Sequence, residues 1–265
     1  MKGNAMRNFG VVVAALVWLA GAGLAQAAQC GSDAGGFEAW KSAFAPEAKA
    51  AGIGPRGLSA LAGTHYATKT IWADRHQKAF HLSLDAFMRQ RGAAAIISRG
   101  RALKAQNAAL FSSIEARFGV PAGPVIAIWG METGFGAVTG NQNTISAVAS
   151  LAYDCRRHDY FTEQLVAALK LVDKGVLSAS SIGAMHGEVG QTQFMPKNIF
   201  AYGVGGSLTV KENALASTAN FLKGHGWKRG AGYQPGQPNY AAIQAWNAAA
   251  VYEQALAIIG QKIDQ

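Results

Sequence analysis

A helical stretch that is almost wholly apolar and ends in one carboxylate constrains this chain more than any other feature. Residues 125–131 read VIAIWGM, and Glu132 follows them directly before the glycine-rich segment 133–137. Pro124 suits the first position of a helix, so we expect the helix to begin there. Because an apolar helix is buried, the pattern predicts that Glu132 lies at the edge of the protein's core.

This placement of Glu132 has chemical consequences. Burial disfavours the charged form of a carboxyl and so raises its pKa, and the partial negative charge at the end of a helix acts in the same direction. A carboxyl that keeps its proton near neutral pH can act as a general acid. Gly134 and Gly136 remove side-chain bulk beside it, which leaves room for a ligand to approach the backbone. The residues alone leave a structural alternative open, in which a buried Glu132 pairs with an arginine.

The rest of the chain also favours helices. Strand-like alternation is scarce, and we find no internal repeat, low-complexity linker or second-domain composition. We therefore predict one mostly-α domain over 28–265, with at most a small β-hairpin in the turn-rich segment 201–210. Apart from the helix that begins at Pro124, apolar spacing and end signals predict helices over 101–118, 159–174, 209–223 (opened by the capping-box pattern TVKE) and 239–262, with a loop over 232–239.

The N-terminus has the pattern of a secretory signal peptide over 1–27. Two basic residues precede an uncharged stretch, 9–25, and Ala-Gln-Ala at 25–27 offers small residues to a signal peptidase. A membrane anchor is the weaker interpretation because two glycines interrupt the stretch. A lipid attached to Cys30 is disfavoured because Gln29 stands where such a signal needs a small residue.

Net charge limits the partners. The chain carries +9, and +7 once the two basic residues of the signal segment are removed. A basic exported protein meets cell-wall polymers, lipid headgroups or nucleic acid. Nucleic acid is the least favoured because no runs of lysine or arginine with interleaved aromatics occur.

The two cysteines are Cys30 and Cys155. An even number in an oxidising compartment favours a disulfide, which would tie the mature N-terminus to the middle of the domain. Two unrelated free thiols are the alternative. Their spacing does not match a zinc site.

Two motifs carry a family resemblance. WGMETGFG at 129–136 together with GEVGQTQFMP at 187–196 resembles the lytic murein transglycosylases, specifically the membrane-bound transglycosylase B-like family. The resemblance runs from about 36 to 263 and implies a lysozyme-like helical catalytic domain in the periplasm. Further segments that resemble the family in the expected order are RFGVPAGPVIAI, SLAYDCRRHDYF, ANFLKGHGW and AWNAAAVY.

The resemblance implies cleavage of the β-1,4 bond between N-acetylmuramic acid and N-acetylglucosamine in peptidoglycan, with a 1,6-anhydro product. Most glycosidases need two carboxyls. Here the sugar's own C6 hydroxyl can replace water, so Glu132 would act first as acid and then as base. Two alternatives stay open: a lysozyme-type hydrolase in which Glu188 or Asp154 positions water, and a non-catalytic peptidoglycan-binding protein.

Matching motif positions imply substrate-binding residues. Gln193 matches a substrate-contacting glutamine, although a bracing amide is the alternative. Arg156 and Arg157 match a pair that contacts the lactyl-peptide part of muramic acid. The alternative for this pair is a solvated role or a salt bridge to Asp154 or Asp159.

Asn247 matches an active-site asparagine and Tyr252 a nearby tyrosine, with a core-facing or capping pair as the alternative. Trp246 stands where the family commonly has tyrosine, which keeps an aromatic face in the site and changes its hydrogen bond. Phe135 and Met195 are expected to serve packing more than sugar binding.

Other positions depart from the family. A serine expected before the glutamine motif aligns with Ala184, and Glu188 and His186 occupy places where small residues are expected. The segment 202–210 has no acidic residue, so we expect no calcium loop there, and more generally no metal or cofactor. The expected partner is the peptidoglycan glycan strand, bound by a monomer with no membrane segment after signal removal.

Overall fold

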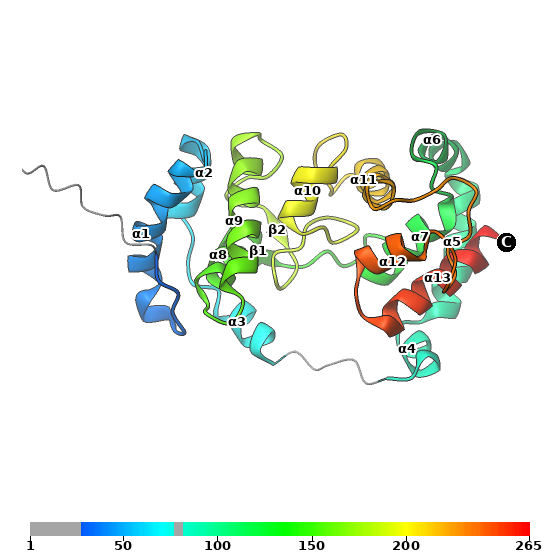
Figure 1. The fold of residues 1–265 in the computed structure, drawn as a ribbon, viewed down its shortest axis with the longest axis horizontal. Helices are drawn as coiled ribbons and strands as arrows, with labels where there is room; N and C mark the ends of the chain where they lie inside the picture. The colour runs from blue at the N-terminus through cyan, green and yellow to red at the C-terminus, as the bar shows by residue number, and fades with distance from the viewer. Residues whose placement is uncertain (1–27, 77–81) are drawn as a thin grey trace, which may run out of the picture.

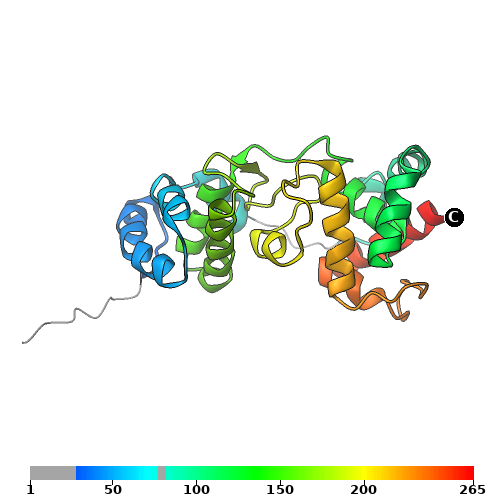
Figure 2. The ribbon, with the colours of Figure 1, turned by 90° about the horizontal axis from the view of Figure 1, so that it is seen from above.

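The computed structural model describes residues 28–76 and 82–265. The described part is elongated, with the first two α-helices at one end and the C-terminus at the other, where the four α-helices over 84–133 lie beside the last helix (Figures 1 and 2). The mostly-α prediction is confirmed. The predicted signal peptide, 1–27, lies outside the described residues. Within those residues, no helix has both the length and the apolar character needed to cross a membrane.

The helices form two lobes. We name the first the α9 lobe, because its other helices pack on or beside α9, and it contains α1 (Phe37–Ala50), α2 (Pro55–Ala62), α3 (Thr68–Arg75), α8 (Thr144–Tyr153), α9 (His158–Asp173) and α10 (Pro196–Tyr202). A short 3-10 helix (Ala34–Gly36) precedes α1. The disulfide between Cys30 and Cys155 is confirmed, and it ties the start of this lobe to the turn before α9.

The second lobe, the α7 lobe, surrounds α7. It contains α4 (Leu84–Gln90), α5 (Ala93–Gln106), α6 (Ala108–Phe118), α7 (Ala122–Thr133), α11 (Lys211–Gly224), α12 (Tyr240–Trp246) and α13 (Ala250–Asp264). The lobes join where α10 packs against α11 and where the segment after α7 crosses to the α9 lobe (Figure 2).

The helix α7 begins two residues earlier than predicted. Pro121 precedes it in an extended conformation, and the backbone N–H of Gly123 donates to Asp264 of α13 at 2.8 Å. Pro124 therefore stands in the first helical turn, where a missing N–H leaves no helical bond unmade. All residues of α7 except Glu132 are buried, as its apolar sequence predicts.

Two predicted helices are each broken by an asparagine. The range 101–118 is divided at Asn107, and the range 239–262 is divided at Asn247, whose backbone is extended. The Asn247 side chain accepts the backbone N–H of Ala249 at 3.0 Å, which stabilises the turn into α13. By contrast, the prediction over 159–174 is confirmed to within one residue at each end, since α9 spans His158–Asp173.

The predicted capping box at the start of the helix over 209–223 is also wrong. The helix α11 begins at Lys211 after Val210, and no side chain caps it. Thr209 instead contacts Ser207, hydroxyl to hydroxyl, at 2.8 Å.

The segment 201–210, where we expected at most a small β-hairpin, contains no strand. The two strands of the described residues are β1 (Gln142–Asn143) and β2 (Ile182–Gly183), which pair antiparallel with Gln142 opposite Gly183. In 201–210 the carbonyls of Gly205 and Ser207 instead bind the Asn213 side chain. The loop predicted over 232–239 is confirmed.

Candidate active site

Glu132 is the next-to-last residue of α7 and lines a cavity of about 200 Å³ at the junction of the lobes. The α7 lobe contributes Glu132 and two residues at the α12–α13 break. The α9 lobe contributes the segment that follows β2 and the start of α10. The other lining residues are Glu188, Gln193, Phe194, Met195, Asn198, Trp246 and Asn247.

Two aromatic donors hold one oxygen of the Glu132 carboxyl. The Tyr252 hydroxyl donates to Oε1 at 2.5 Å, and the Trp246 indole N–H donates to the same oxygen at 3.0 Å. Among residues 28–76 and 82–265, none makes a hydrogen bond with Oε2. A neutral carboxyl therefore carries its proton on Oε2, where it can be given to a ligand.

The break at Asn247 is what brings these donors together. Trp246 ends α12 and Tyr252 lies in the first turn of α13, so the kink between the two helices lets both side chains reach Glu132. The Trp246 ring packs edge-on against Phe194 at 5.2 Å, which holds it against the α9-lobe segment. A continuous helix over 239–262 would have spaced the two donors differently.

Burial is the main influence on the pKa of Glu132, and it raises that pKa above the ordinary glutamate value. The hydrogen bonds from Tyr252 and Trp246 act in the opposite direction, as does the positive charge of Arg91, while the charge of Glu188 adds to the increase. Burial and the neighbouring Glu132 also raise the pKa of Tyr252 well above its ordinary value, so Tyr252 stays a neutral donor.

Gln193 lies in a tight loop closed by a bridge between Val189 and Phe194. Its backbone has φ of 55°, in the left-handed region that few non-glycine residues adopt. Its amide nitrogen donates to the Gly190 carbonyl at 2.9 Å and to the Thr139 carbonyl at 3.4 Å. The amide oxygen is then the group with which Gln193 can accept a hydrogen bond from a ligand in the cavity.

Gln191, which sequence reasoning missed, connects this loop to α7. Its side-chain oxygen accepts the Trp129 indole N–H at 3.0 Å, and its carbonyl accepts the Thr133 hydroxyl at 2.5 Å. The same side chain fills the space beside Gly136, because a Cβ there would lie 2.5 Å from the Gln191 oxygen. The expectation that Gly136 leaves room for a ligand is therefore wrong. Gly134 ends α7 with φ of 58°.

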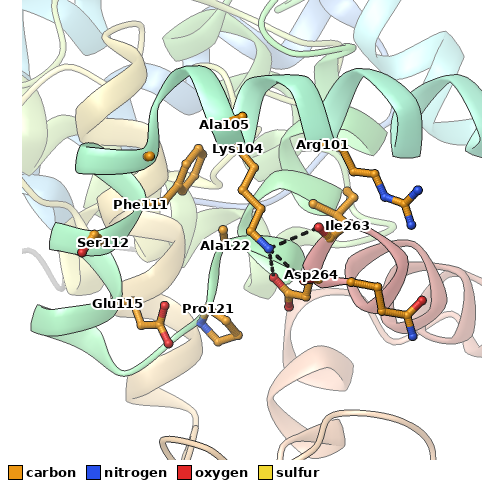
Figure 3. A pocket seen from close by; sticks show the side chains of 12 residues that line it. Arg101, Lys104, Ala105, Phe111, Ser112, Glu115, Pro121, Ala122, Ile263 and Asp264 are labelled. Atoms are coloured by element: carbon orange, nitrogen blue, oxygen red, sulfur yellow. Dashed lines mark hydrogen bonds and ion pairs between the residues drawn. The ribbon is translucent and has the colours of Figure 1, made fainter.

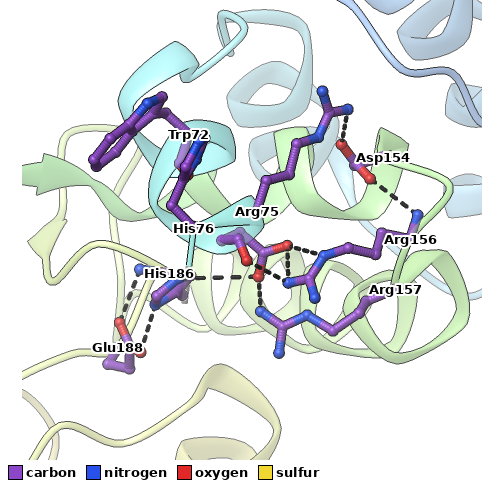
Figure 4. Close-up of polar contacts among 9 residues, drawn as sticks. Trp72, Arg75, His76, Asp154, Arg156, Arg157, His186 and Glu188 are labelled. Carbon is purple, nitrogen blue, oxygen red and sulfur yellow. Dashed lines mark hydrogen bonds and ion pairs between the residues drawn. The ribbon is translucent and has the colours of Figure 1, made fainter. Parts of the chain in front are cut away.

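Arg156 and Arg157 do not line the cavity. Both guanidiniums bind the carboxylate of Asp74, which is 1% exposed, and Arg156 also donates to the Asp74 carbonyl at 2.8 Å (Figure 4). Asp74, which sequence reasoning did not single out, is thus their partner in place of Asp154 or Asp159. Asp154 pairs instead with Arg75.

Glu188 connects this ionic network to the cavity. The backbone N–H of His186 donates to Oε2 of Glu188 at 2.9 Å, and the His186 ring lies 3.4 Å from Oε1 (Figure 4). Burial pushes the pKa of Glu188 upward, but the contacts with His186, together with the backbone N–H of Glu188 itself, outweigh burial, and the pKa lies below the ordinary value. Glu188 is therefore a charged residue in the same cavity as Glu132.

The expected packing residues lie beside the site. Phe135 packs edge-on against Trp129 at 5.3 Å, in agreement with a packing role. Met195 packs against the core and also lines the cavity. Ala184 donates its backbone N–H to the Glu188 carbonyl at 2.8 Å.

A larger cavity of about 920 Å³ lies elsewhere, between α5, α6 and the end of α13 (Figure 3). Its Lys104 is bound to the Asp264 carboxylate and to the carbonyls of Ile263 and Asp264, and Arg101 donates to the Lys262 carbonyl. No carboxyl there has the desolvated setting of Glu132, so we place the chemistry in the smaller cavity. In the described parts of the chain, no three His, Cys, Asp or Glu side chains gather into a group that could hold a metal ion.

Comparison with known families decides the classification. The model of the family described as "Transglycosylase SLT domain" matches residues 36–237. The chain belongs to the transglycosylase SLT domain family. This confirms the family expected from the WGMETGFG and GQTQFMP motifs.

An individual protein is similar to this chain as well. The membrane-bound lytic murein transglycosylase B of Escherichia coli is 33% identical over 137 residues, which are 46% of this chain and 38% of that protein. The chain thus aligns with well under half of the length of this relative.

Solved structures extend the comparison over more of the chain. SltB3 from Pseudomonas aeruginosa, solved in complex with NAG-NAM-pentapeptide, has a TM-score of 0.79 and 28% identity over 86% of this chain and 79% of that chain. Soluble lytic transglycosylase SltB1 from the same organism has a TM-score of 0.75 at 21% identity, covering 84% of this chain and 97% of that one. These likenesses confirm the expected lysozyme-like helical fold of the lytic transglycosylases.

Proposed function

We propose that this protein is a lytic transglycosylase that cleaves the β-1,4 bond between N-acetylmuramic acid and N-acetylglucosamine in peptidoglycan and leaves a 1,6-anhydro end. The observation that carries the proposal is the desolvated Glu132 carboxyl, held through Oε1 by Trp246 and Tyr252 in a cavity between the lobes. Family membership supports it, as does the peptidoglycan fragment in the SltB3 complex.

In this mechanism Glu132 acts twice. Its Oε2 proton passes to the glycosidic oxygen as the bond from that oxygen to C1 breaks, and the carboxyl becomes a carboxylate. The C6 hydroxyl oxygen of the N-acetylmuramic acid that carries this C1 then bonds to C1, and the hydroxyl proton passes to Glu132. The anhydro ring closes, the carboxyl is restored, and no water is consumed.

Binding roles follow from the contacts around the cavity. Gln193 would accept a hydrogen bond through its amide oxygen, and Asn247 would bind an acetamido group from the opposite lobe. Trp246 offers an aromatic face beside the acid. Arg156 and Arg157, whose side chains are 43% and 33% exposed, would bind the peptide-bearing part of the substrate outside the cavity with the donors that Asp74 leaves unused.

The proposal includes a location and a domain organisation. The signal pattern over 1–27 supports export to the periplasm, where peptidoglycan lies. We assign residues 28–265 to one catalytic domain that acts as a monomer, and 36–237 is the part that the family model matches.

One observation favours a second candidate, the lysozyme-type hydrolase. Glu188 is a charged carboxylate in the same cavity and could position a water molecule for attack on C1. Digestion of purified peptidoglycan sacculi followed by mass spectrometry separates the two reactions. We expect anhydro ends that are lost in Glu132→Gln, whereas reducing ends would identify the hydrolase.

A further inference from the structure

Glu188 has no task in a mechanism that uses one carboxyl, yet it lines the cavity of Glu132. Its two oxygens are fixed by a single residue, since Oε2 accepts the His186 N–H at 2.9 Å and Oε1 lies 3.4 Å from the His186 ring nitrogen Nδ1. Only 24% of the Glu188 side chain is exposed. The carboxylate therefore stays at the cavity wall instead of moving freely in solvent.

His186 is itself anchored behind Glu188. Its second ring nitrogen, Nε2, lies 4.0 Å from Oδ1 of Asp74, and Asp74 is held by the guanidiniums of Arg156 and Arg157 (Figure 4). This network joins α3, the turn before α9 and the segment after β2. Turning Glu188 away from the cavity would break its contacts with His186, so its position is built into the α9 lobe.

The pKa values of the two carboxyls of the cavity are shifted in opposite directions. Burial raises the pKa of Glu132, whereas the contacts with His186 leave the pKa of Glu188 below its ordinary value. Environments that separate the pKa values of two neighbouring carboxyls assign one as the acid and the other as a standing negative charge.

We propose that Glu188 is a further catalytic residue, whose fixed carboxylate stabilises the positive charge that develops on the sugar ring as its bond to C1 breaks. This inference rests on the proposed function. Glu188 forms no bond with the sugar and exchanges no proton. The leaving oxygen keeps the bonding electrons and takes the Glu132 proton, and the positive charge is shared by C1 and the ring oxygen until the C6 oxygen attacks.

The test is a steady-state comparison on a defined peptidoglycan oligosaccharide. Glu188→Gln removes the charge but keeps the size and an acceptor for the His186 N–H. Losing a preorganised charge should lower kcat about 10²- to 10³-fold, with KM nearly unchanged. Glu188→Asp keeps the charge and should recover part of kcat. The matched control is Glu38→Gln on α1, whose side chain is 75% exposed, and it should behave as the wild type.

Thermal melts of each variant accompany the rates, so that a loss of fold is separated from a loss of charge. An unchanged kcat in Glu188→Gln would overturn the inference alone, as would equal losses in the Gln and Asp variants. Wild-type reducing ends that disappear in Glu188→Gln would make the residue a water-positioning base and also overturn it. A wild type that releases no soluble fragments would instead refute the proposed function, and this inference with it.

Discussion

Glu132 and Glu188 line the same cavity, yet the two lobes surround them with different neighbours. The α7 lobe surrounds Glu132 with apolar residues and two neutral donors, so burial dominates and the pKa rises. The α9 lobe gives Glu188 a histidine backed by an ionic network, so the pKa falls. The pKa of the same type of side chain is thus raised in one lobe and lowered in the other, because the neighbours differ.

The largest effect should come from removing the acid. Glu132→Gln deletes the proton that Oε2 would donate but keeps an oxygen for the Tyr252 and Trp246 donors. General acid–base catalysis contributes about 10²- to 10⁴-fold, so release of soluble muropeptides should fall by about that factor. Sacculus digestion with matched amounts of folded protein measures it. Release at the wild-type rate would remove Glu132 from the chemistry.

The next-largest effect should come from removing the carboxylate charge at the centre of the ionic network in the α9 lobe. Asp74→Asn leaves Arg156 and Arg157 without a charged partner at a site that is 1% exposed. We expect a loss of about 1–3 kcal/mol in the free energy of unfolding, since both arginines can still reach water. Urea unfolding followed by circular dichroism measures the loss.

The control for Asp74→Asn is Glu163→Gln. It breaks the exposed pair of Glu163 and Lys197, whose side chains are 61% and 58% exposed. Such a pair contributes at most about 1 kcal/mol. If the two substitutions cost the same, the Asp74 network does not anchor the α9 lobe.

A smaller effect is expected from Tyr252→Phe, which removes one donor to Oε1 of Glu132. Because that hydrogen bond lowers the pKa of Glu132, its loss should raise the pKa further and move the alkaline limb of the pH–kcat profile to higher pH. Poorer orientation of the carboxyl should lower kcat about tenfold. Tyr240→Phe, outside the cavity, is the control. A limb that moves to lower pH would contradict the assigned direction.

The smallest effect concerns stability. Below the ordinary glutamate pKa, Glu132 is protonated in both folded and unfolded chains. As pH rises through the window up to the folded-state pKa, the unfolded chain loses this proton first, so the wild type loses stability. The Glu132→Gln variant has no such proton to lose. Its melting temperature, relative to that of the wild type, should therefore rise as pH increases over this window. A constant difference between the two would show that the carboxyl is not perturbed.

Sequence reasoning succeeded where the determining interactions are local. The apolar spacing in α9 predicted its bounds to within one residue, and the composition of α7 predicted a buried helix that presents Glu132 at its end. The cysteine pair was likewise predictable, because parity and compartment alone favour a disulfide.

Sequence reasoning failed where residues far apart in the sequence decide the conformation. Asn107 interrupts a helical pattern, and its side-chain oxygen binds Lys211 on α11, 104 residues away. Likewise, no local pattern connects Asp74 with Arg156, since they are 82 residues apart. The convergence of Trp246 and Tyr252 on Glu132 required the break at Asn247, where helical periodicity predicted one continuous helix.

The central physical claim is that burial raises the pKa of Glu132. Titration of the Glu132 side-chain carboxyl by ¹³C NMR, with the signal assigned by its absence in Glu132→Gln, measures this directly. We predict that the pKa of Glu132 lies above the ordinary glutamate value of 4.5. The pKa of Glu188, measured in the same spectra, should lie below that ordinary value. A Glu132 carboxyl that titrates at or below 4.5 would contradict the account.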